Sequence, residues 1–212
     1  MSLPDSGFDY VAAVYDPLAR LVYGRALQQA QLAALTALPT GAPYILIIGG
    51  GTGWVLGEAL RQRPAAKVLY LEASPQMLRR SQEFLRQHWP TKLAQVEFRL
   101  GTEDALRPRE QFDAVVTFFL LDLFEPARLR QLIARLQAAR RPEAPWLLAD
   151  FARPATWWHR SLLAAMYAFF GLTTGISARR RPPIELELQR LGLAARPVGS
   201  YFGGMVEASV WQ

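Results

Sequence analysis

The sequence contains no cysteine and only two histidines, His88 and His159. Without thiols it can form neither a disulfide framework nor a thiolate metal site, and two separate imidazoles do not make a metal centre, so no metal is expected. Lysine is also scarce, being restricted to Lys67 and Lys92, so the net charge of +6 rests on arginine. Because the arginines are spread over expected helix faces, we interpret them as a solvated surface and expect no stable nucleic-acid partner.

Long hydrophobic runs and a cationic leader are missing too. The N-terminus begins with polar and acidic residues, and the most apolar stretch, residues 161–176, is shorter than the roughly 20 residues that span a bilayer. Hydrophobic residues make up 51% of the chain and charged residues 20%, which is sufficient for a real core and argues against disorder. We therefore expect a soluble, cytoplasmic protein without a transmembrane segment.

The stretch around which the chain is organised is residues 44–53. Five apolar residues, three of them β-branched, predict a strand that is buried on both faces. The glycines that follow, Gly49, Gly51 and Gly53, let the backbone turn sharply and approach a ligand before a helix over residues 54–61. This order of elements is typical of a site for a nucleotide-type cofactor.

The glycine spacing narrows the type of cofactor. A dinucleotide fingerprint has its third glycine where Trp54 stands, so a pyrophosphate fits poorly, and an NAD oxidoreductase is a minor alternative. A second strand, residues 67–72, ends at Glu72, about 20 residues after the loop. An acidic side chain at this position can accept hydrogen bonds from both ribose hydroxyls.

Beyond this point strands and helices alternate. The expected strands are 96–100, 112–119 and 146–151, the expected helices 74–88 and 125–141, and residues 195–202 and 205–211 should pair through a turn at Gly203-Gly204. The pattern predicts an α/β fold of the Rossmann-like, doubly wound type. We expect a seven-stranded, mostly parallel sheet with an antiparallel C-terminal hairpin and helices on both faces.

Two flanking segments are expected to act as caps on a single domain that spans residues 1–212. Residues 1–40 form an N-terminal helical cap, and residues 152–183 form a helical insertion over the substrate. The second segment is rich in aromatic residues between Trp157 and Phe170, which suits a pocket for a flat or lipid-like molecule. Its tryptophans and arginines also suit weak contact with a membrane surface.

Several segments together resemble the class I S-adenosylmethionine (SAM) dependent methyltransferases, and within them the ubiquinone/menaquinone-biosynthesis group. They are Phe8-Asp9 with Tyr15-Asp16, the glycine motif at Ile45–Gly53, the strand end at Val68–Glu72 with Ala73 and Ser74, the fourth-strand motif at Phe112–Val116, and the terminal hairpin. The resemblance covers nearly the whole chain. It implies SAM as the cofactor and a small-molecule methyl acceptor, in a monomer or a homodimer.

The resemblance also implies which residues hold the cofactor. They are Tyr15, Gly49, Gly50, Gly51, Thr52, Gly53, Glu72, Ala73, Ser74, Met77, Thr102, Glu103, Asp104, Thr117 and Phe118. The family commonly places an aspartate directly after Gly101 to receive the adenine amino group. Here Thr102, Glu103 and Asp104 follow that glycine, so which of the three meets adenine stays open.

The sequence departs from the family at two further positions. Ile47 replaces an acid that helps to orient the amino group of the cofactor, and Leu121-Asp122-Leu123 replaces a histidine pair beyond the fourth strand. No histidine base can therefore be transferred to that loop. Candidates for a general base are Tyr15, Asp122 and His159, although no motif fixes any of them.

The predicted function is methyl transfer by in-line displacement to a small acceptor that is apolar or aromatic, such as a quinone or a lipid-like molecule. One alternative is polyamine aminopropyl transfer, because Ile47–Gly51 resembles the loop of that family. That chemistry needs acidic residues after the fourth strand, where Thr117-Phe118-Phe119 offers none. Another alternative is a catalytically weak SAM-fold binding protein associated with nucleic acid, motivated by Ile47 and the basic charge.

Overall fold

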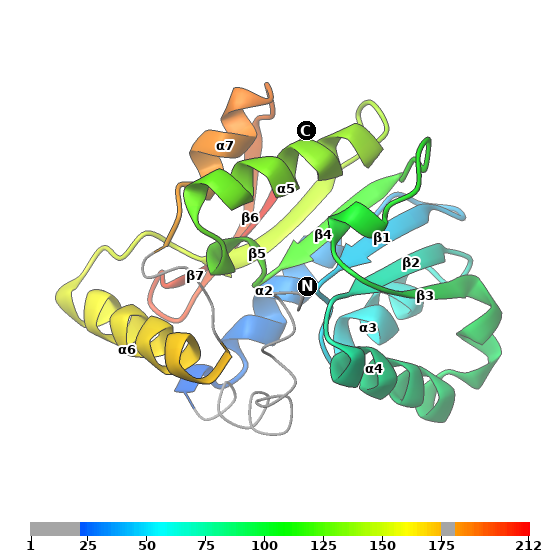
Figure 1. Cartoon of the computed structure of the whole chain (residues 1–212), viewed down its shortest axis with the longest axis horizontal. Helices are drawn as coiled ribbons and strands as arrows, with labels where there is room; N and C mark the ends of the chain where they lie inside the picture. Colours follow the sequence, from blue (N-terminus) through cyan, green and yellow to red (C-terminus); the bar gives the residue numbers. More distant parts are fainter. Residues whose placement is uncertain (1–21, 175–180) are drawn as a thin grey trace.

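The computed structural model describes residues 22–174 and 181–212 (Figure 1). Within these ranges the strands form one seven-stranded sheet in the order β3-β2-β1-β4-β5-β7-β6. Strands β1 to β5 run parallel, and β7 is antiparallel to both β5 and β6. The bounds are β1 (Tyr44–Ile48), β2 (Lys67–Glu72), β3 (Val96–Leu100), β4 (Ala114–Phe118), β5 (Trp146–Phe151), β6 (Ala195–Tyr201) and β7 (Val206–Trp211). The predicted fold class is confirmed.

Helices cover both faces of the sheet (Figure 1). The α-helices are α2 (Ala26–Leu35), α3 (Trp54–Gln62), α4 (Pro75–His88), α5 (Pro126–Ala139), α6 (Trp157–Thr174) and α7 (Ile184–Arg190). The alternate residues of β1 show how the two cores are divided. Ile45 and Ile47 pack towards α2, α3 and α4, whereas Leu46 and Ile48 pack towards α5 and α7. This two-sided burial is why β1 reads as a continuous apolar run.

The centre of the sheet determines where a ligand can bind. β1 pairs with β2 on one side and with β4 on the other. The chain therefore adds β2 and β3 on one side of β1 and the later strands on the opposite side. In doubly wound sheets the crevice beyond the carboxyl ends of the strands at such a switch point is the usual ligand site. The loops after β1, β2, β4 and β5 all belong to this edge of the sheet.

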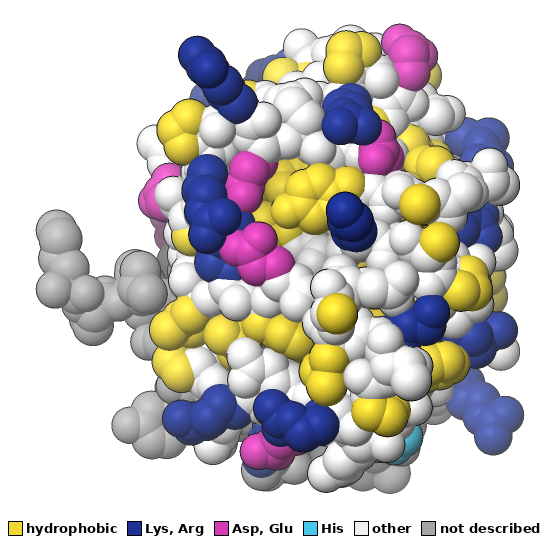
Figure 2. Space-filling model, turned by 90° about the vertical axis from the view of Figure 1, so that its right-hand side faces the viewer, with side chains coloured by type: hydrophobic (Ala, Val, Ile, Leu, Met, Phe, Trp, Pro, Cys, Tyr) yellow, Lys and Arg dark blue, Asp and Glu magenta, His cyan; other side chains and the backbone are white. Residues whose placement is uncertain are grey.

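Basic side chains are dispersed over the face beside the edge strand β3 (Figure 2). Hydrophobic and acidic side chains lie among them on this face. Many arginines of the described chain are ion-paired, for example Arg128 with Glu103 and Arg130 with Glu187. The positive charge on this face is therefore not gathered into a single patch.

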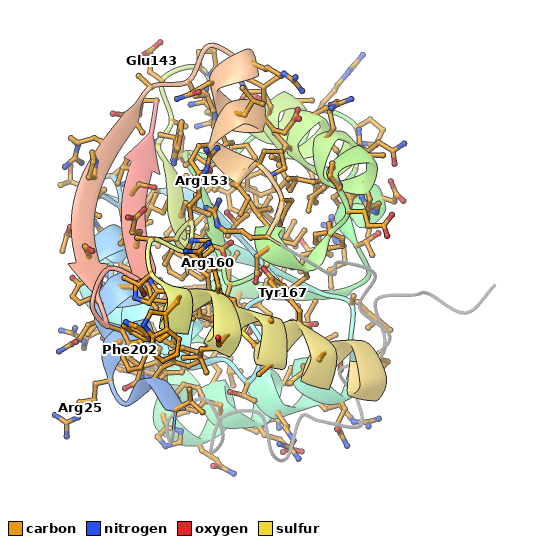
Figure 3. All side chains as sticks on the ribbon, turned by 90° about the vertical axis from the view of Figure 1, so that its left-hand side faces the viewer. Arg25, Glu143, Arg153, Arg160, Tyr167 and Phe202 are labelled. Atoms are coloured by element: carbon orange, nitrogen blue, oxygen red, sulfur yellow. The ribbon has the colours of Figure 1, made fainter. Side chains whose placement is uncertain are left out.

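Helix α6 runs across the side of the molecule that also carries β6 and β7 (Figure 3). Phe202, at the turn between these strands, lies beside the first turn of α6, with its ring centroid 5.9 Å from that of Trp158. Leu163 and Tyr167 are buried, whereas Arg160 is exposed. No helix in residues 22–174 or 181–212 combines the length and apolar character that crossing a membrane requires.

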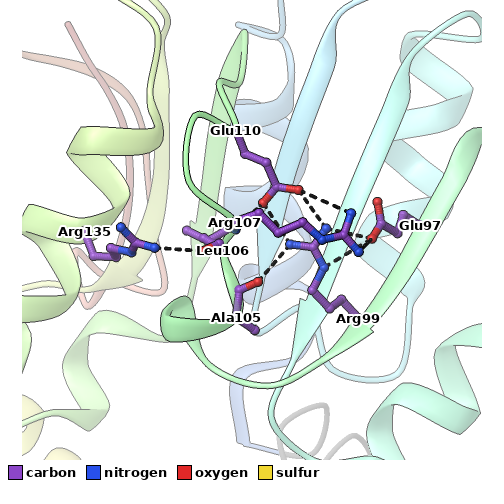
Figure 4. Close-up of polar contacts among 7 residues, drawn as sticks. All are labelled: Glu97, Arg99, Ala105, Leu106, Arg107, Glu110 and Arg135. Carbon is purple, nitrogen blue, oxygen red and sulfur yellow. Dashed lines mark hydrogen bonds and ion pairs between the residues drawn. The ribbon is translucent and has the colours of Figure 1, made fainter.

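A network of ion pairs fastens the loop that follows β3 (Figure 4). Arg99 donates to both carboxylate oxygens of Glu110 at 2.7 and 2.8 Å, and to the carbonyl oxygen of Ala105 at 2.9 Å. Glu97 accepts from Arg99 at 2.6 Å. Arg135, from α5, donates to the carbonyl oxygen of Leu106 at 2.7 Å. These bonds fix the loop between β3 and β4 against its own strand and against α5.

Most predicted elements are present, with small differences at their ends. The fourth strand covers 114–118 rather than 112–119, because Phe112 forms only an isolated bridge with Arg140. The segment from Phe8 to residue 21, which includes Tyr15, lies outside the described residues.

Candidate functional site

The glycine loop between β1 and α3 has a backbone that other residues rarely adopt. Gly49, Gly51 and Gly53 have φ values of 67°, 64° and 98°, all in the left-handed region. A side chain at these positions would clash with its own backbone, which costs roughly 1–2 kcal/mol per residue. The predicted turn at the carboxyl end of β1 is therefore present, and Gly53 serves as the N-cap of α3.

The glycines also differ in what surrounds them. A Cβ on Gly50 would lie 2.6 Å from the Tyr70 ring, and one on Gly53 would lie 2.8 Å from the backbone of Ser81. A Cβ on Gly51 would meet no atom within 4 Å. Gly50 and Gly53 thus let the loop pack on β2 and α4, whereas Gly51 turns its bare Cα to open space. An open backbone position inside a packed loop fits a ligand that lies against the main chain.

Glu72, at the end of β2, holds its carboxylate against this loop. The Gly51 N–H donates to Oε2 at 3.1 Å, and the Ser74 N–H donates to Oε1 at 3.0 Å. The Tyr70 hydroxyl donates to the Gly51 carbonyl oxygen at 2.9 Å. Both polar groups of the Gly51 peptide are thus bound by residues of β2, so the loop and the acid form one rigid unit.

The start of α4 continues the same edge of the sheet. Ser74 is fully buried, and its Oγ caps the helix by accepting from the Met77 N–H at 3.1 Å. Met77 is buried and Ala73 is half-buried. The predicted contacts Ala73, Ser74 and Met77 therefore follow Glu72 directly at the edge of the sheet where the glycine loop lies.

The three candidate adenine contacts after β3 differ in burial and in hydrogen-bond partners. Glu103 is buried and bound by Arg128 of α5, whose Nη2 donates to Oε2 at 2.8 Å. Asp104 is exposed, and Thr102 is half-buried at the start of the turn. The side chain of Glu103 is thus engaged in a structural ion pair, which leaves Thr102 and Asp104 as the predicted adenine contacts.

Two other predicted contacts lie at the end of β4. Thr117 is fully buried, and its Oγ1 accepts from the Trp146 indole N–H at 2.8 Å, so this side chain belongs to the core under α5. Phe118 points to the opposite face of the sheet and is also buried. If Thr117 contacts the cofactor, only its backbone is available to do so.

The loop after β4 and the end of β5 bring two aspartates together. Asp122 and Asp150 are 1% and 3% exposed. The Tyr167 hydroxyl donates to Oδ2 of Asp122 at 3.4 Å, and the Phe151 N–H donates to Oδ1 of Asp150 at 2.8 Å. Burial raises the pKa of Asp122 to about 6, and burial together with the charge of Asp122 raises the pKa of Asp150 well above its usual value.

The sequence predicts a role only for Asp122 among these residues. The available signal was Asp150 itself, an acid in a strand whose other residues are all apolar. Such a residue at the carboxyl end of a buried strand favours a site over a structural role.

Of the other two candidate bases, the structure describes only His159. Tyr15 lies outside the described residues. His159 is 1% exposed, and within the described chain neither ring nitrogen has a hydrogen-bond partner. Its ring lies 4.0 Å from that of Trp158, and its Nε2 faces Gly203 in the turn between β6 and β7. His159 is thus placed at the first turn of α6, two turns before Tyr167.

Comparison with known proteins gives a match to part of the chain and a fold. Residues 45–143, slightly less than half of the chain, match the family described as "Methyltransferase domain". No match was found among curated proteins. The matched residues run from β1 into the loop after α5, so they contain the glycine loop, Glu72 and Asp122.

Three solved structures illustrate the fold. Mitomycin 7-O-methyltransferase MmcR has 23% identity and a TM-score of 0.65, with 97% of this chain and 60% of that chain covered. The O-methyltransferase family 2 protein from Planctomyces limnophilus, solved with apigenin, has 14% identity, a TM-score of 0.68, and coverages of 100% and 62%. An O-methyltransferase family protein from Burkholderia thailandensis has 17% identity, a TM-score of 0.65, and coverages of 99% and 59%.

This chain spans about three fifths of the length of these methyltransferases. Their shared part includes the whole sheet and its helices. Residues 45–143 therefore resemble a methyltransferase domain, and the strand order and the similar solved structures show a Rossmann-like methyltransferase fold.

Proposed function

We propose that this chain transfers a methyl group from SAM to a small apolar or aromatic acceptor at the carboxyl edge of β4 and β5. The observation that carries the proposal is the unit formed by Gly51 and Glu72. A carboxylate fixed beside an open glycine provides two oxygens for ribose hydroxyls and bare main chain for the rest of the cofactor. We also propose that residues 1–212 act as one domain, with residues 1–40 and 152–183 as caps.

The roles of the protein groups follow from this arrangement. SAM supplies an electrophilic methyl group on a sulfonium sulfur, so the protein need not supply a nucleophile of its own. Gly51 and Glu72 would hold the nucleoside part, with Thr102 or Asp104 at the adenine. The remaining task of the chain is to orient the acceptor in line with the methyl group and to exclude water, which accounts for much of the acceleration in such reactions.

The segments beyond β4 and β5 support an apolar acceptor. Tyr23 packs against Phe151 and Phe202 with ring centroids 5.3 Å apart in both cases. Phe119 packs against Phe151 at 5.5 Å, and the Tyr23 hydroxyl contacts the sulfur of Met166. Aromatic and thioether surfaces with few polar groups suit flat organic molecules. The similar methyltransferase solved with apigenin, a flat aromatic molecule, points to the same acceptor class.

The alternatives have less support from the structure. The arginines at Arg128, Arg130 and Arg141 are ion-paired with acids, which lowers their value for binding a phosphate backbone. Acids do occur beyond β4, as aminopropyl transfer requires, but the positive Arg181 acts on both Asp122 and Asp150. A cationic amine would therefore compete with a cation that the chain already provides.

A matched pair of glycine variants tests cofactor binding. Gly51→Ala and Gly41→Ala both place a methyl group in open space at positive φ, with φ values of 64° and 81°. The backbone strain should therefore be similar, about 1 kcal/mol in each variant. Gly41 precedes β1, at the opposite edge of the sheet. We expect calorimetry to show S-adenosylhomocysteine binding weakened about tenfold or more in Gly51→Ala only, since 1.4 kcal/mol of lost contact is a factor of ten.

The acceptor class is tested separately. Transfer of labelled methyl from SAM would be measured to 1,4-naphthohydroquinone, to a simple phenol, to putrescine and to RNA. We expect product with the hydroquinone or the phenol. Equal loss of cofactor binding in both glycine variants would contradict the assignment of the loop, and methylation restricted to RNA or putrescine would contradict the acceptor class.

A further inference from the structure

The strongest unassigned feature is the pair Asp122 and Asp150. Asp122 lies in the short turn Leu121–Leu123 directly after β4, and Asp150 is the penultimate residue of β5. The two strands are neighbours in parallel register, with Phe118 opposite Ala149. The carboxyl ends of β4 and β5 therefore bring the two acids to the same edge as the glycine loop.

The segment that carries Asp122 also touches the cofactor loop. A Cβ added to Gly49 would lie 2.8 Å from Cδ1 of Leu120, two residues before Asp122. Leu120 thus packs directly on the head of the loop. A group held by this turn is therefore adjacent to the glycine loop, where the cofactor is expected.

The polar atoms of the pair are not fully satisfied by the described chain. Asp122 Oδ1 and Asp150 Oδ2 are buried and have no hydrogen-bond partner among the described residues. Buried polar atoms in folded proteins nearly always have a partner, and each exception calls for an explanation. A proton held by one carboxyl supplies one donor to a cluster that otherwise has too many acceptors, and an acceptor hydroxyl would supply the other.

Charged and titratable groups surround the pair on several elements. Tyr167 of α6 donates to Asp122, Tyr23 approaches Asp122 from the segment before α2, and Arg181 and Glu185 approach Asp150 from the start of α7. Arg181 also donates to the Phe151 carbonyl oxygen and pairs with Glu185. Arg181 thus faces all three acids, and Arg153 lies 3.8 Å from Glu185. Full ionisation of both buried aspartates would therefore leave uncompensated negative charge in the interior, which is costly.

We propose that Asp122 and Asp150 form a carboxyl pair that holds one proton at neutral pH, with Asp122 ionised and accepting the proton of the methyl acceptor. Tyr167 and Arg181 are positioning residues that orient the two carboxyls. The proposal rests on the methyl-transfer function above and names the general base of that site. Two like charges in contact favour such sharing, because the first ionisation opposes the second.

The step is balanced within the site. The acceptor O–H bond breaks, and its proton goes to Asp122. The oxygen uses its electron pair to form the bond to the methyl carbon, and the pair of the broken C–S bond stays on sulfur. S-Adenosylhomocysteine and a methyl ether result, and the proton later leaves Asp122 for solvent.

The proton sharing can be measured without an acceptor. The protein would be labelled with ¹³C at the aspartate carboxyl groups, and the wild type, Asp122→Asn and Asp150→Asn would be titrated by NMR. We expect one carboxyl to ionise close to pH 6 and its partner to stay protonated at neutral pH. In Asp122→Asn, the pKa of Asp150 should fall, because the negative neighbour has been removed. Independent ionisation of both carboxyls below pH 5 would overturn the pair.

The role as base is measured with the hydroquinone probe. Asp122→Asn should lower the rate about 100-fold or more, a typical contribution of a general base, while S-adenosylhomocysteine affinity changes less than about twofold. Tyr167→Phe should shift the pH at which the rate is half-maximal, which a purely structural contact would not do. Asp113→Asn is the control: Asp113 precedes β4, at the opposite edge of the sheet, and accepts from the Tyr44 N–H at 2.8 Å.

The outcomes separate the two proposals. If the wild type binds S-adenosylhomocysteine but methylates neither hydroquinone nor phenol, the proposed acceptor class fails, and the NMR titration still decides the one-proton pair. If the wild type is active and Asp122→Asn keeps its rate, Asp122 is not the base, and the proposal is overturned. A rate loss in Asp113→Asn as large as that in Asp122→Asn would likewise assign the effect to folding.

Discussion

Two clusters of acidic side chains in this protein have pKa values that are shifted in opposite directions. At the β3 edge, Glu110 is bound by both terminal nitrogens of Arg99, and these hydrogen bonds hold the pKa of Glu110 below its usual value. At the carboxyl edge of β4 and β5, burial raises the pKa values of Asp122 and Asp150. The surroundings thus favour the ionised form of a carboxyl group at one place and its protonated form at the other.

The pKa shifts differ in direction because nearby cations favour the charged form of a carboxyl group, whereas burial disfavours it. In the β3 cluster each acid has an arginine close by, and water reaches part of the network. Asp122 and Asp150 both depend on Arg181, which also pairs with Glu185, and water barely reaches the two aspartates. Clusters of the first type stabilise a loop, whereas perturbed acids of the second type concentrate at functional sites.

The largest effect is expected from removing Arg181, the buried arginine beside the aspartate pair. The Arg181 side chain is only 7% exposed, and Arg181→Met would leave Glu185 and the aspartate pair without it. Breaking a buried ion pair on one side typically costs 3–5 kcal/mol, so we expect a loss of stability of about that size. Urea unfolding at pH 7.5, followed by circular dichroism, measures it.

The comparison is sharpened by a double variant. Arg181→Met combined with Asp150→Asn removes one of the acids that depend on this arginine, and it should recover part of the lost stability. Additive losses in the double variant would contradict the coupling between Arg181 and Asp150.

The next effect is a dependence of stability on pH. The folded pKa of Asp122 is raised from 3.8 to about 6, so the folded state holds the proton more tightly than the unfolded state does. Stability from this group is fully present below the unfolded pKa and is lost as the pH rises through the folded pKa. A shift of this size corresponds to about 3 kcal/mol. Thermal unfolding between pH 5 and pH 8 should show a falling midpoint in the wild type.

Glu110 contributes with the opposite sign. Its folded pKa is lowered, so its stabilisation is present above the unfolded pKa and is lost as the pH falls through the folded pKa. The double variant Asp122→Asn with Asp150→Asn should therefore make the unfolding midpoint less dependent on pH between pH 5 and pH 8 and leave its dependence at acidic pH unchanged. Glu110→Gln should reduce the dependence at acidic pH and leave the dependence between pH 5 and pH 8 unchanged. A wild-type midpoint that rises from pH 5 to pH 8 would rule out the raised pKa values.

The fold and the contact between the glycine loop and Glu72 could be predicted from the sequence because their signals are local. An apolar run followed by glycines predicts β1 and its turn, and an acid at the end of the next strand predicts Glu72 beside it. Both depend on neighbouring positions and on one parallel pairing, Ile48 with Leu71, which places the ends of the two strands side by side. Periodicity is sufficient for such a prediction.

The buried cluster beyond β4 and β5 could not be predicted because its contacts join distant segments. Tyr167 and Asp122 are 45 positions apart, and no pattern relates them. The same reason applies to Glu103, one of three residues that the sequence offers as an adenine contact, which the structure pairs with Arg128, 25 positions away. Thr117 similarly accepts from Trp146, 29 positions away. Such pairings depend on how helices and strands pack, which the local pattern does not encode.

The smallest effect tests whether burial or the N–O distance determines the strength of an ion pair. Arg99 with Glu110 and Arg61 with Glu58 have the same N–O separation of 2.7 Å, but the side chains of the first pair are 12% and 15% exposed and those of the second 54% and 22%. Arg99→Gln should cost about 1–3 kcal/mol, because it removes two charged hydrogen bonds to a partly buried carboxylate. Arg61→Gln should cost less than about 0.5 kcal/mol, as exposed pairs at this helical spacing do. Urea unfolding of the two variants at pH 7 measures both losses, and equal losses would mean that separation, rather than access of water, determines the strength of ion pairs in this protein.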